Sequence, residues 1–165
     1  MTRNKFLSFV AICLFTLLGC DSKQVLDTYK TLPNQWHKDS VVKINFKAPD
    51  SVNPYNLFVN VRNNHEYPFN NLFLIVKMNF PNGKIVADTL EYKMAKPDGT
   101  LLGTGFSDIK ENKLWYKENV IFNESGTYQV SIQQAMRQNG EENGLVNLKG
   151  VTDVGFRIEY PEIPQ

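Results

Sequence analysis

Cys20 is the residue whose neighbours in the sequence indicate a definite chemistry. It ends the segment Leu17-Leu18-Gly19-Cys20, which resembles the bacterial lipobox. In that motif a peptidase cuts before a cysteine whose thiol already carries a diacylglyceryl group. Leu18 is bulkier than the small residue often found at its place. We therefore expect lipid attachment at Cys20, with acyl chains such as palmitate contributing about 0.8 kcal/mol of membrane affinity per buried methylene.

The nineteen residues before Cys20 have the organisation of a secretory signal peptide. Arg3 and Lys5 precede an apolar run over residues 6–18, and this run of 13 residues is too short to span a bilayer as a helix. An ordinary signal peptide with an incidental cysteine is the alternative, but no small-x-small cleavage site is evident near the end of the run. We predict a signal peptide over residues 1–19.

Composition excludes several classes of function for the mature chain. Removal of Arg3 and Lys5 leaves 16 basic and 17 acidic residues, so no basic surface for nucleic acid is expected. Cys20 is then the only cysteine, which excludes a disulfide framework and a CxxC redox pair. Hydrophobic residues make up 42% of the chain and aromatic residues 12%, enough for a folded core.

No motif indicates catalysis, a metal or a cofactor. His37 and His65 stand apart without carboxylates at ligand spacing, and the nucleophile-elbow, zinc-protease and phosphate-loop patterns are missing from the sequence. Residues 97–109 contain three glycines, but Asp108 stands where a phosphate loop would need a third loop glycine, so a structural loop with Asp108 capping its backbone is expected. We expect a protein that is not an enzyme.

Aromatic residues are the remaining candidates for binding. Five of them could line a groove for a peptide, a glycan or a protein: Trp36, Tyr67, Phe69, Trp115 and Tyr116. Aromatic residues on strands are more often part of a core. For Trp36 and His37 the alternatives are a ligand-stacking pair and a packed cap over a sheet.

The chain divides into a tether and one domain. Residues 20–40 are polar, mixed and interrupted by Pro33, which indicates a tether. From residue 41 the pattern alternates with a period of two, which is typical of half-buried strands. Seven strands are expected within a domain over residues 41–162, in the segments 41–47, 57–62, 72–78, 85–94, 114–122, 128–133 and 154–160.

Turn residues separate these segments, with Asn82-Gly83 as the clearest tight turn. Strands of this number and spacing predict an all-β fold, an antiparallel β-sandwich of immunoglobulin-like arrangement. Tyr128, just after the turn at Gly126, is placed as in a tyrosine corner. A buried strand tyrosine is the plainer alternative.

Three long segments resemble the GldH family, lipoproteins of the gliding-motility apparatus of Bacteroidetes. They are WHKDSVVKINFKAPD (36–50), YNLFVNVRNNHEYPFNNLFLIV (55–76) and PDGTLLGTGFSDIKENKLWYKENVIF (97–122), the last followed by GTYQVSI (126–132). The resemblance covers the whole chain. It implies an accessory lipoprotein, anchored in the outer membrane and facing the periplasm, and linked to type IX secretion.

The resemblance also implies partners: other Gld lipoproteins such as GldJ, or components of the secretion system. It implies no catalytic residue, and only Cys20 corresponds to a position with an assigned chemistry. Two kinds of function remain open at this point, an accessory subunit that binds proteins and an envelope module that binds a glycan or a peptide. A hydrolase is a distant third, because no nucleophile or acid–base pair can be named.

Overall fold

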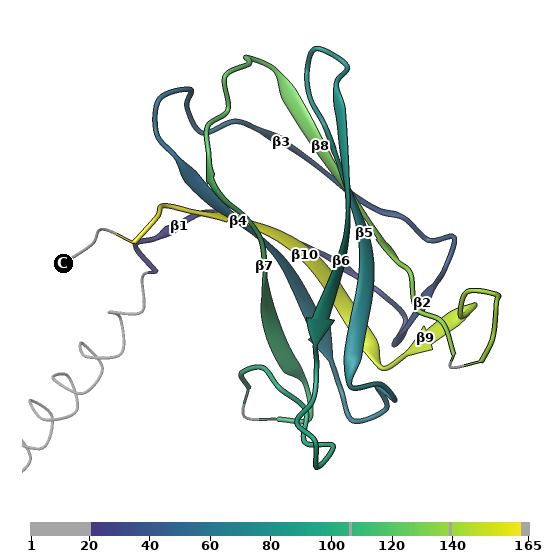
Figure 1. Cartoon of the computed structure of the whole chain (residues 1–165). Coiled ribbons are helices and arrows are strands. Elements are labelled where there is room, and N and C mark those ends of the chain that lie inside the picture. Colours follow the sequence, from purple (N-terminus) through teal and green to yellow (C-terminus); the bar gives the residue numbers. More distant parts are fainter. Residues whose placement is uncertain (1–20, 106, 139, 163–165) are drawn as a thin grey trace, which may run out of the picture.

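The structure is a computed structural model that describes residues 21–105, 107–138 and 140–162, so the expected signal peptide and the expected lipid on Cys20 lie outside it. The described ranges contain ten strands and no helix (Figure 1). The strands are β1 (Gln24–Thr31), β2 (Gln35–His37), β3 (Val42–Lys47), β4 (Tyr55–Asn63), β5 (Asn71–Asn79), β6 (Ile85–Lys93), β7 (Lys110–Val120), β8 (Thr127–Gln134), β9 (Asn147–Lys149) and β10 (Val151–Glu159).

Two four-stranded antiparallel sheets face each other and enclose the core. We call them the β10 sheet, in the order β1-β10-β4-β7, and the β8 sheet, in the order β3-β8-β5-β6; β2 and β9 form a separate short pair. Alternate residues of each central strand point inward, for example Phe156 of β10 and Ile132 of β8, and both are fully buried. The predicted antiparallel β-sandwich is confirmed.

The strand order is that of a jelly roll, which corrects the expected immunoglobulin-like arrangement. The first strand pairs with the last, β2 with β9, β3 with β8, β4 with β7 and β5 with β6. The chain is therefore one long hairpin rolled into two sheets. In an immunoglobulin domain the last strand would pair beside the strand that carries the corner tyrosine. Here β10 lies between β1 and β4, in the other sheet from β8.

All seven expected strands are present, and three further strands lie outside the expected set. Two of them change the expected organisation, because β1 and β2 both lie within the expected tether over residues 20–40. Strand β1 pairs with β10, and β2 pairs with β9. Most of the side chains of β1 are partly buried, without the alternation of a clean strand. The short strands β2 and β9 have three residues each, too few to show any period.

The tyrosine corner predicted at Tyr128 is confirmed. The hydroxyl of Tyr128 donates to the backbone carbonyl of Glu124 at 3.1 Å and accepts from the backbone N–H of the same residue at 3.3 Å. Its ring is fully buried and packs on Phe46 and Phe122. The corner thus fixes the turn before β8, although the fold is a jelly roll.

The glycine-containing loop before β7 is structural, as expected. Thr104 forms an antiparallel bridge with Glu111, so the loop runs back along the start of β7. Gly103 has a φ of 97°, and a Cβ atom there would lie 2.6 Å from the carbonyl oxygen of Glu111. Only glycine fits this close approach. Asp108 was expected to cap this loop, but its carboxylate lies 2.7 Å from the Nδ1 atom of His65, and no backbone N–H among the described loop residues donates to it.

Candidate functional site

Arg157 is the centre of a polar network on the outer face of the β10 sheet, the face turned away from the core. Its side chain is only 10% exposed. The guanidinium donates to Glu159 at 2.5 Å, to Asp27 at 2.7 Å and to Gln24 at 3.2 Å, and it also pairs with Asp21. Glu159 lies two residues further along β10 on the same face, and Asp27 is the partner of Arg157 across the β1–β10 ladder.

The charges of this network compensate one another. Burial opposes the charge of Arg157, but the hydrogen bonds to Glu159, Asp27 and Asp21 prevail and raise its pKa above the ordinary value. The pKa of Asp21 is lowered, first by the hydrogen bond from the backbone N–H of Lys23 and then by that from Arg157. Lys113 of β7 adds a second cation, with its ammonium 3.0 and 3.1 Å from the two carboxylate oxygens of Glu159.

A second row of residues crosses the sheet beside Arg157. The ring of Tyr29 lies against Gly155, where a Cβ atom would be 2.8 Å from the ring, so the glycine makes room for the aromatic side chain. Asn60 donates to the hydroxyl of Tyr29 at 2.8 Å and to Asp27 at 3.1 Å. Burial, followed by the charge of Asp27, raises the pKa of Tyr29 to about 12. The Oδ1 atom of Asn60 is buried and has no partner among the described residues.

Trp115 is the exposed aromatic residue of this face. Its side chain is 48% exposed, and its ring meets the buried ring of Phe58 edge-on at 4.7 Å. The ammonium of Lys113 lies 4.7 Å from the centre of the Phe58 ring. The backbone carbonyl of Trp115 accepts a hydrogen bond from the hydroxyl of Tyr92 at 2.6 Å, which ties β7 to the β8 sheet. The indole ring of Trp115 is thus exposed to solvent from a strand that is held in place by contacts with both sheets.

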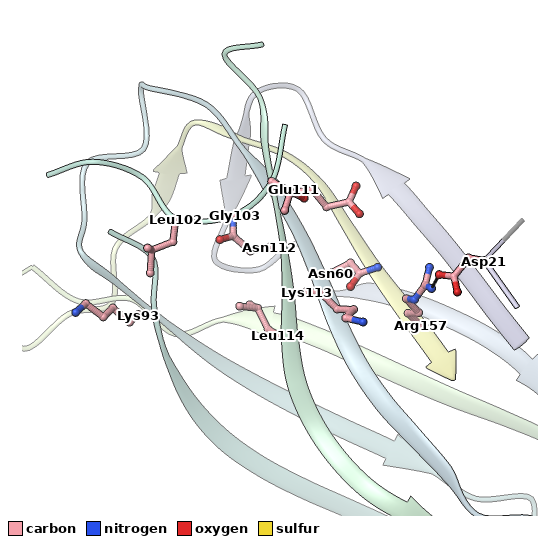
Figure 2. A pocket seen from close by; sticks show the side chains of 11 residues that line it. Asp21, Asn60, Lys93, Leu102, Gly103, Glu111, Asn112, Lys113, Leu114 and Arg157 are labelled. Carbon is pink, nitrogen blue, oxygen red and sulfur yellow. Dashed lines mark hydrogen bonds and ion pairs between the residues drawn. The ribbon is translucent and has the colours of Figure 1, made fainter. Parts of the chain in front are cut away.

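A shallow cavity of about 540 Å³ opens on this side of the molecule (Figure 2). Asp21, Asn60, Lys113 and Arg157 line it on the outer face of the β10 sheet, and Leu102 lines it beyond β7. Arg157 and Asp21 point toward each other in Figure 2, so the residue that follows Cys20 is part of the site.

The five aromatic candidates do not gather on one surface. Trp36 is fully buried, with its indole N–H donating to the backbone carbonyl of Ser40 at 2.7 Å, and Tyr67 and Tyr116 are also core residues. Phe69 is partly buried beside Tyr67. Trp115 is the one residue of this set that is about half exposed, so the set does not assemble a platform of several rings.

The two histidines lie far from the Arg157 network in the sequence and outside it in the structure. His65 is 74% exposed, and its contact with Asp108 raises its pKa, first through the hydrogen bond and then through the negative charge. Within the described ranges no three His, Cys, Asp or Glu side chains come together as a metal site. In the same residues no helix has the length and apolarity to cross a membrane.

Sequence reasoning missed the residues that make this site. Asp21 and Asp27 fell within the segment expected to be a tether, and Arg157 was assigned only to the polar side of a strand. No local signal marked the cluster, because Arg157 and Glu159 alternate with the apolar residues Phe156 and Ile158 as in any strand with one solvent-exposed face.

The fold and the site together define a single-domain jelly-roll protein whose surface chemistry is ion pairing, hydrogen bonding and aromatic contact. Comparison with known proteins makes the assignment specific. The chain belongs to the GldH lipoprotein family, whose model matches residues 24–158. Membership of a lipoprotein family implies association with a membrane of the cell envelope.

Curated relatives match over almost their whole length. The chain is 56% identical over 158 residues to a protein named gliding motility lipoprotein GldH homolog of Christiangramia forsetii, covering 95% of this chain and 97% of the relative. It is 56% identical over 160 residues to the gliding motility lipoprotein GldH of Flavobacterium johnsoniae, covering 97% and 99%.

Solved structures resemble the chain much less. The VP2 subviral particle of infectious bursal disease virus matches with 16% identity and a TM-score of 0.33, covering 86% of this chain and 34% of the viral chain. The Gt strain of that virus matches with 11% identity and a TM-score of 0.31, over the same shares of both chains. The chain thus spans about a third of the viral chains that it matches.

Proposed function

We propose that the protein is a non-enzymatic accessory lipoprotein of the gliding-motility and type IX secretion apparatus. In this proposal it is cut before Cys20, carries lipid on that residue and faces the periplasm from the outer membrane. The observation that carries the proposal is the 56% identity, over 160 residues, to the gliding motility lipoprotein of Flavobacterium johnsoniae. At this level of identity the two folded domains have the same architecture.

Contact with other envelope proteins is the activity that the surface supports best. Among the described residues, the edge strands of both sheets offer backbone hydrogen-bonding groups and apolar side chains to a partner. Strand β6 is the edge of the β8 sheet, and every second side chain along it is exposed, including Ile85, which is 62% exposed, and Thr89. An edge strand of this kind can accept a strand or a loop of a partner. The proposed partners are other Gld lipoproteins or secretion-system components.

The experiment tests anchoring and partner binding in one strain. A deletion strain is complemented with the wild-type chain or with Cys20→Ala, and colony spreading, type IX secretion and membrane recovery of the protein are measured. The proposal expects the wild type to restore all three and Cys20→Ala to lose membrane recovery. Full motility and secretion in the deletion strain would contradict the proposal.

Site-specific crosslinking then tests the contact itself. A photo-crosslinking amino acid at Thr89 is compared with one at Lys43, which is exposed on β3, the opposite edge of the same sheet. We expect a crosslinked envelope protein from Thr89 in wild-type cells and a weaker or absent product from Lys43. Equal products from both positions would argue against a partner at the β6 edge.

A further inference from the structure

We infer that the outer face of the β10 sheet around Trp115 lies against the lipid surface in which the protein is anchored. This inference rests on the proposed lipid at Cys20 and adds to it the orientation of the domain. Its starting point is that Asp21, the next residue, is held on this face by Arg157.

The described chain is held to the domain from its first residues onward, so little free chain separates the domain from the proposed anchor. The backbone N–H of Lys23 donates to Asp21 at 3.1 Å, the ammonium of Lys23 pairs with Glu162 at 2.8 Å, and the backbone N–H of Tyr160 donates to the carbonyl of Lys23 at 3.0 Å. Asp21 is the first described residue, and in the sequence it directly follows Cys20, the proposed site of lipid attachment. A lipid on Cys20 therefore holds the membrane surface close to the Arg157 network.

Strand register places Trp115 beside this point. Arg157 of β10 pairs with Phe58 of β4, and Phe58 pairs with Trp115 of β7. Two strand spacings separate Trp115 from Arg157, which is about 10 Å. Tyr160, just after β10, packs on the buried ring of Tyr55 on the core side of the strand and does not belong to this face, so Trp115 is the aromatic residue that carries the inference. Tryptophan and tyrosine side chains are enriched at membrane–water interfaces, because one part of each ring system is apolar and another forms hydrogen bonds.

Charge on this face neither repels nor strongly attracts a membrane. Arg157 and Lys113 are compensated by the carboxylates around them, and Arg62 pairs with Glu111 at 2.7 Å. The contact therefore depends on the exposed indole ring of Trp115 more than on anionic lipid. The outer face of the β8 sheet differs, because its exposed side chains include Lys43 and Lys77, and a shallow groove on it is lined partly by Gln129 and Gln133.

Tryptophan fluorescence can test this orientation, because the mature chain has only Trp36 and Trp115. Trp36 is fully buried, and Trp115→Tyr replaces the exposed indole by a phenol ring, so the difference between wild type and this variant is the signal of Trp115. The lipidated chain is reconstituted in zwitterionic vesicles with and without lipids that carry bromine near the headgroup. A matched control places tryptophan on the opposite face, as Lys77→Trp in the Trp115→Tyr variant.

We expect brominated lipid to remove about half of the Trp115 signal and none of the signal from Lys77→Trp, because interfacial rings sit at headgroup depth. Equal quenching of both positions would overturn the inferred orientation. An unquenched Trp115 would also overturn it and would leave this face free for a protein partner instead. Recovery with the vesicles is measured separately for Cys20→Ala. If the wild type floats with vesicles no better than Cys20→Ala, the proposed lipid anchor itself is refuted.

Discussion

Replacement of Arg157 by methionine is the sharpest test of the polar network, because methionine keeps much of the buried stem and removes the charge. Loss of one partner from a buried ion pair costs about 3 to 5 kcal/mol, since the remaining charge stays uncompensated. Asp21 is 50% exposed and adds little, while Glu159 keeps its contact with Lys113. We therefore expect a cost near the lower end, about 3 kcal/mol of unfolding free energy.

The assay is urea unfolding of the mature chain with Cys20→Ala and Trp115→Tyr, followed by the fluorescence of the buried Trp36. A loss of about 3 kcal/mol corresponds to a fall in melting temperature of about 10 °C in a domain of this size. Lys117→Met is the matched control, because Lys117 pairs with Asp88 at 2.9 Å in a pair that is about one-third exposed on both sides. That pair should cost only about 0.5 kcal/mol.

Two outcomes decide whether the network stabilises the fold through charge compensation. The cost of Arg157→Met should shrink when Asp27→Asn and Glu159→Gln are also present, because the carboxylates left uncompensated are then gone. If Arg157→Met costs no more than Lys117→Met, the network does not stabilise the fold, and the buried charge of Arg157 needs a different explanation.

Three further predictions concern single contacts. Gly155→Ala should cost about 1 to 3 kcal/mol, because its Cβ atom would collide with the ring of Tyr29, and Tyr29→Ala in the same chain should recover part of this in urea unfolding. Tyr128→Phe should cost about 1 kcal/mol by the same assay, through loss of the corner hydrogen bonds, whereas a cost near zero would contradict the role of the hydroxyl. NMR titration should show the pKa of His65 above 6.5 in the wild type and lower in Asp108→Asn. Because folding raises this pKa, the contact between His65 and Asp108 stabilises the protein fully below the pKa of the unfolded chain. This stabilisation disappears as the pH rises through the pKa of the folded protein.

Local alternation predicted the strands well but could not decide their neighbours. In β3, the buried residues Val42, Ile44 and Phe46 alternate with exposed polar residues, so the face of each side chain follows from the period alone. The period says which face is buried and nothing about which strand lies alongside. The pairing of β1 with β10 depends on contacts between residues more than a hundred positions apart, and these leave no local pattern.

The site was hidden for a related reason. Trp115 and Tyr116 were proposed together as a contact surface, yet neighbouring residues of a strand point to opposite faces, so only one of them could be exposed. Trp115 is the exposed one, while Tyr116 donates from the core side to Asp88 at 3.0 Å. Strand β1 escaped prediction because its outward residues Asp27 and Tyr29 are partly buried by the network, which removes the contrast between its two sides.

The jelly-roll topology links the proposed anchor to the completion of folding. Because the first strand pairs with the last, Asp21 can reach Arg157 only after β10 has joined the sheet. Until then β1 has no partner strand, because its neighbour in the described sheet is β10, beside which it lies in the finished fold (Figure 1). Pairs this distant in sequence form late, since their loop-closure entropy must be overcome first. The orientation of the domain at the membrane is therefore a property of the finished fold, and Arg157 is the residue that connects the two.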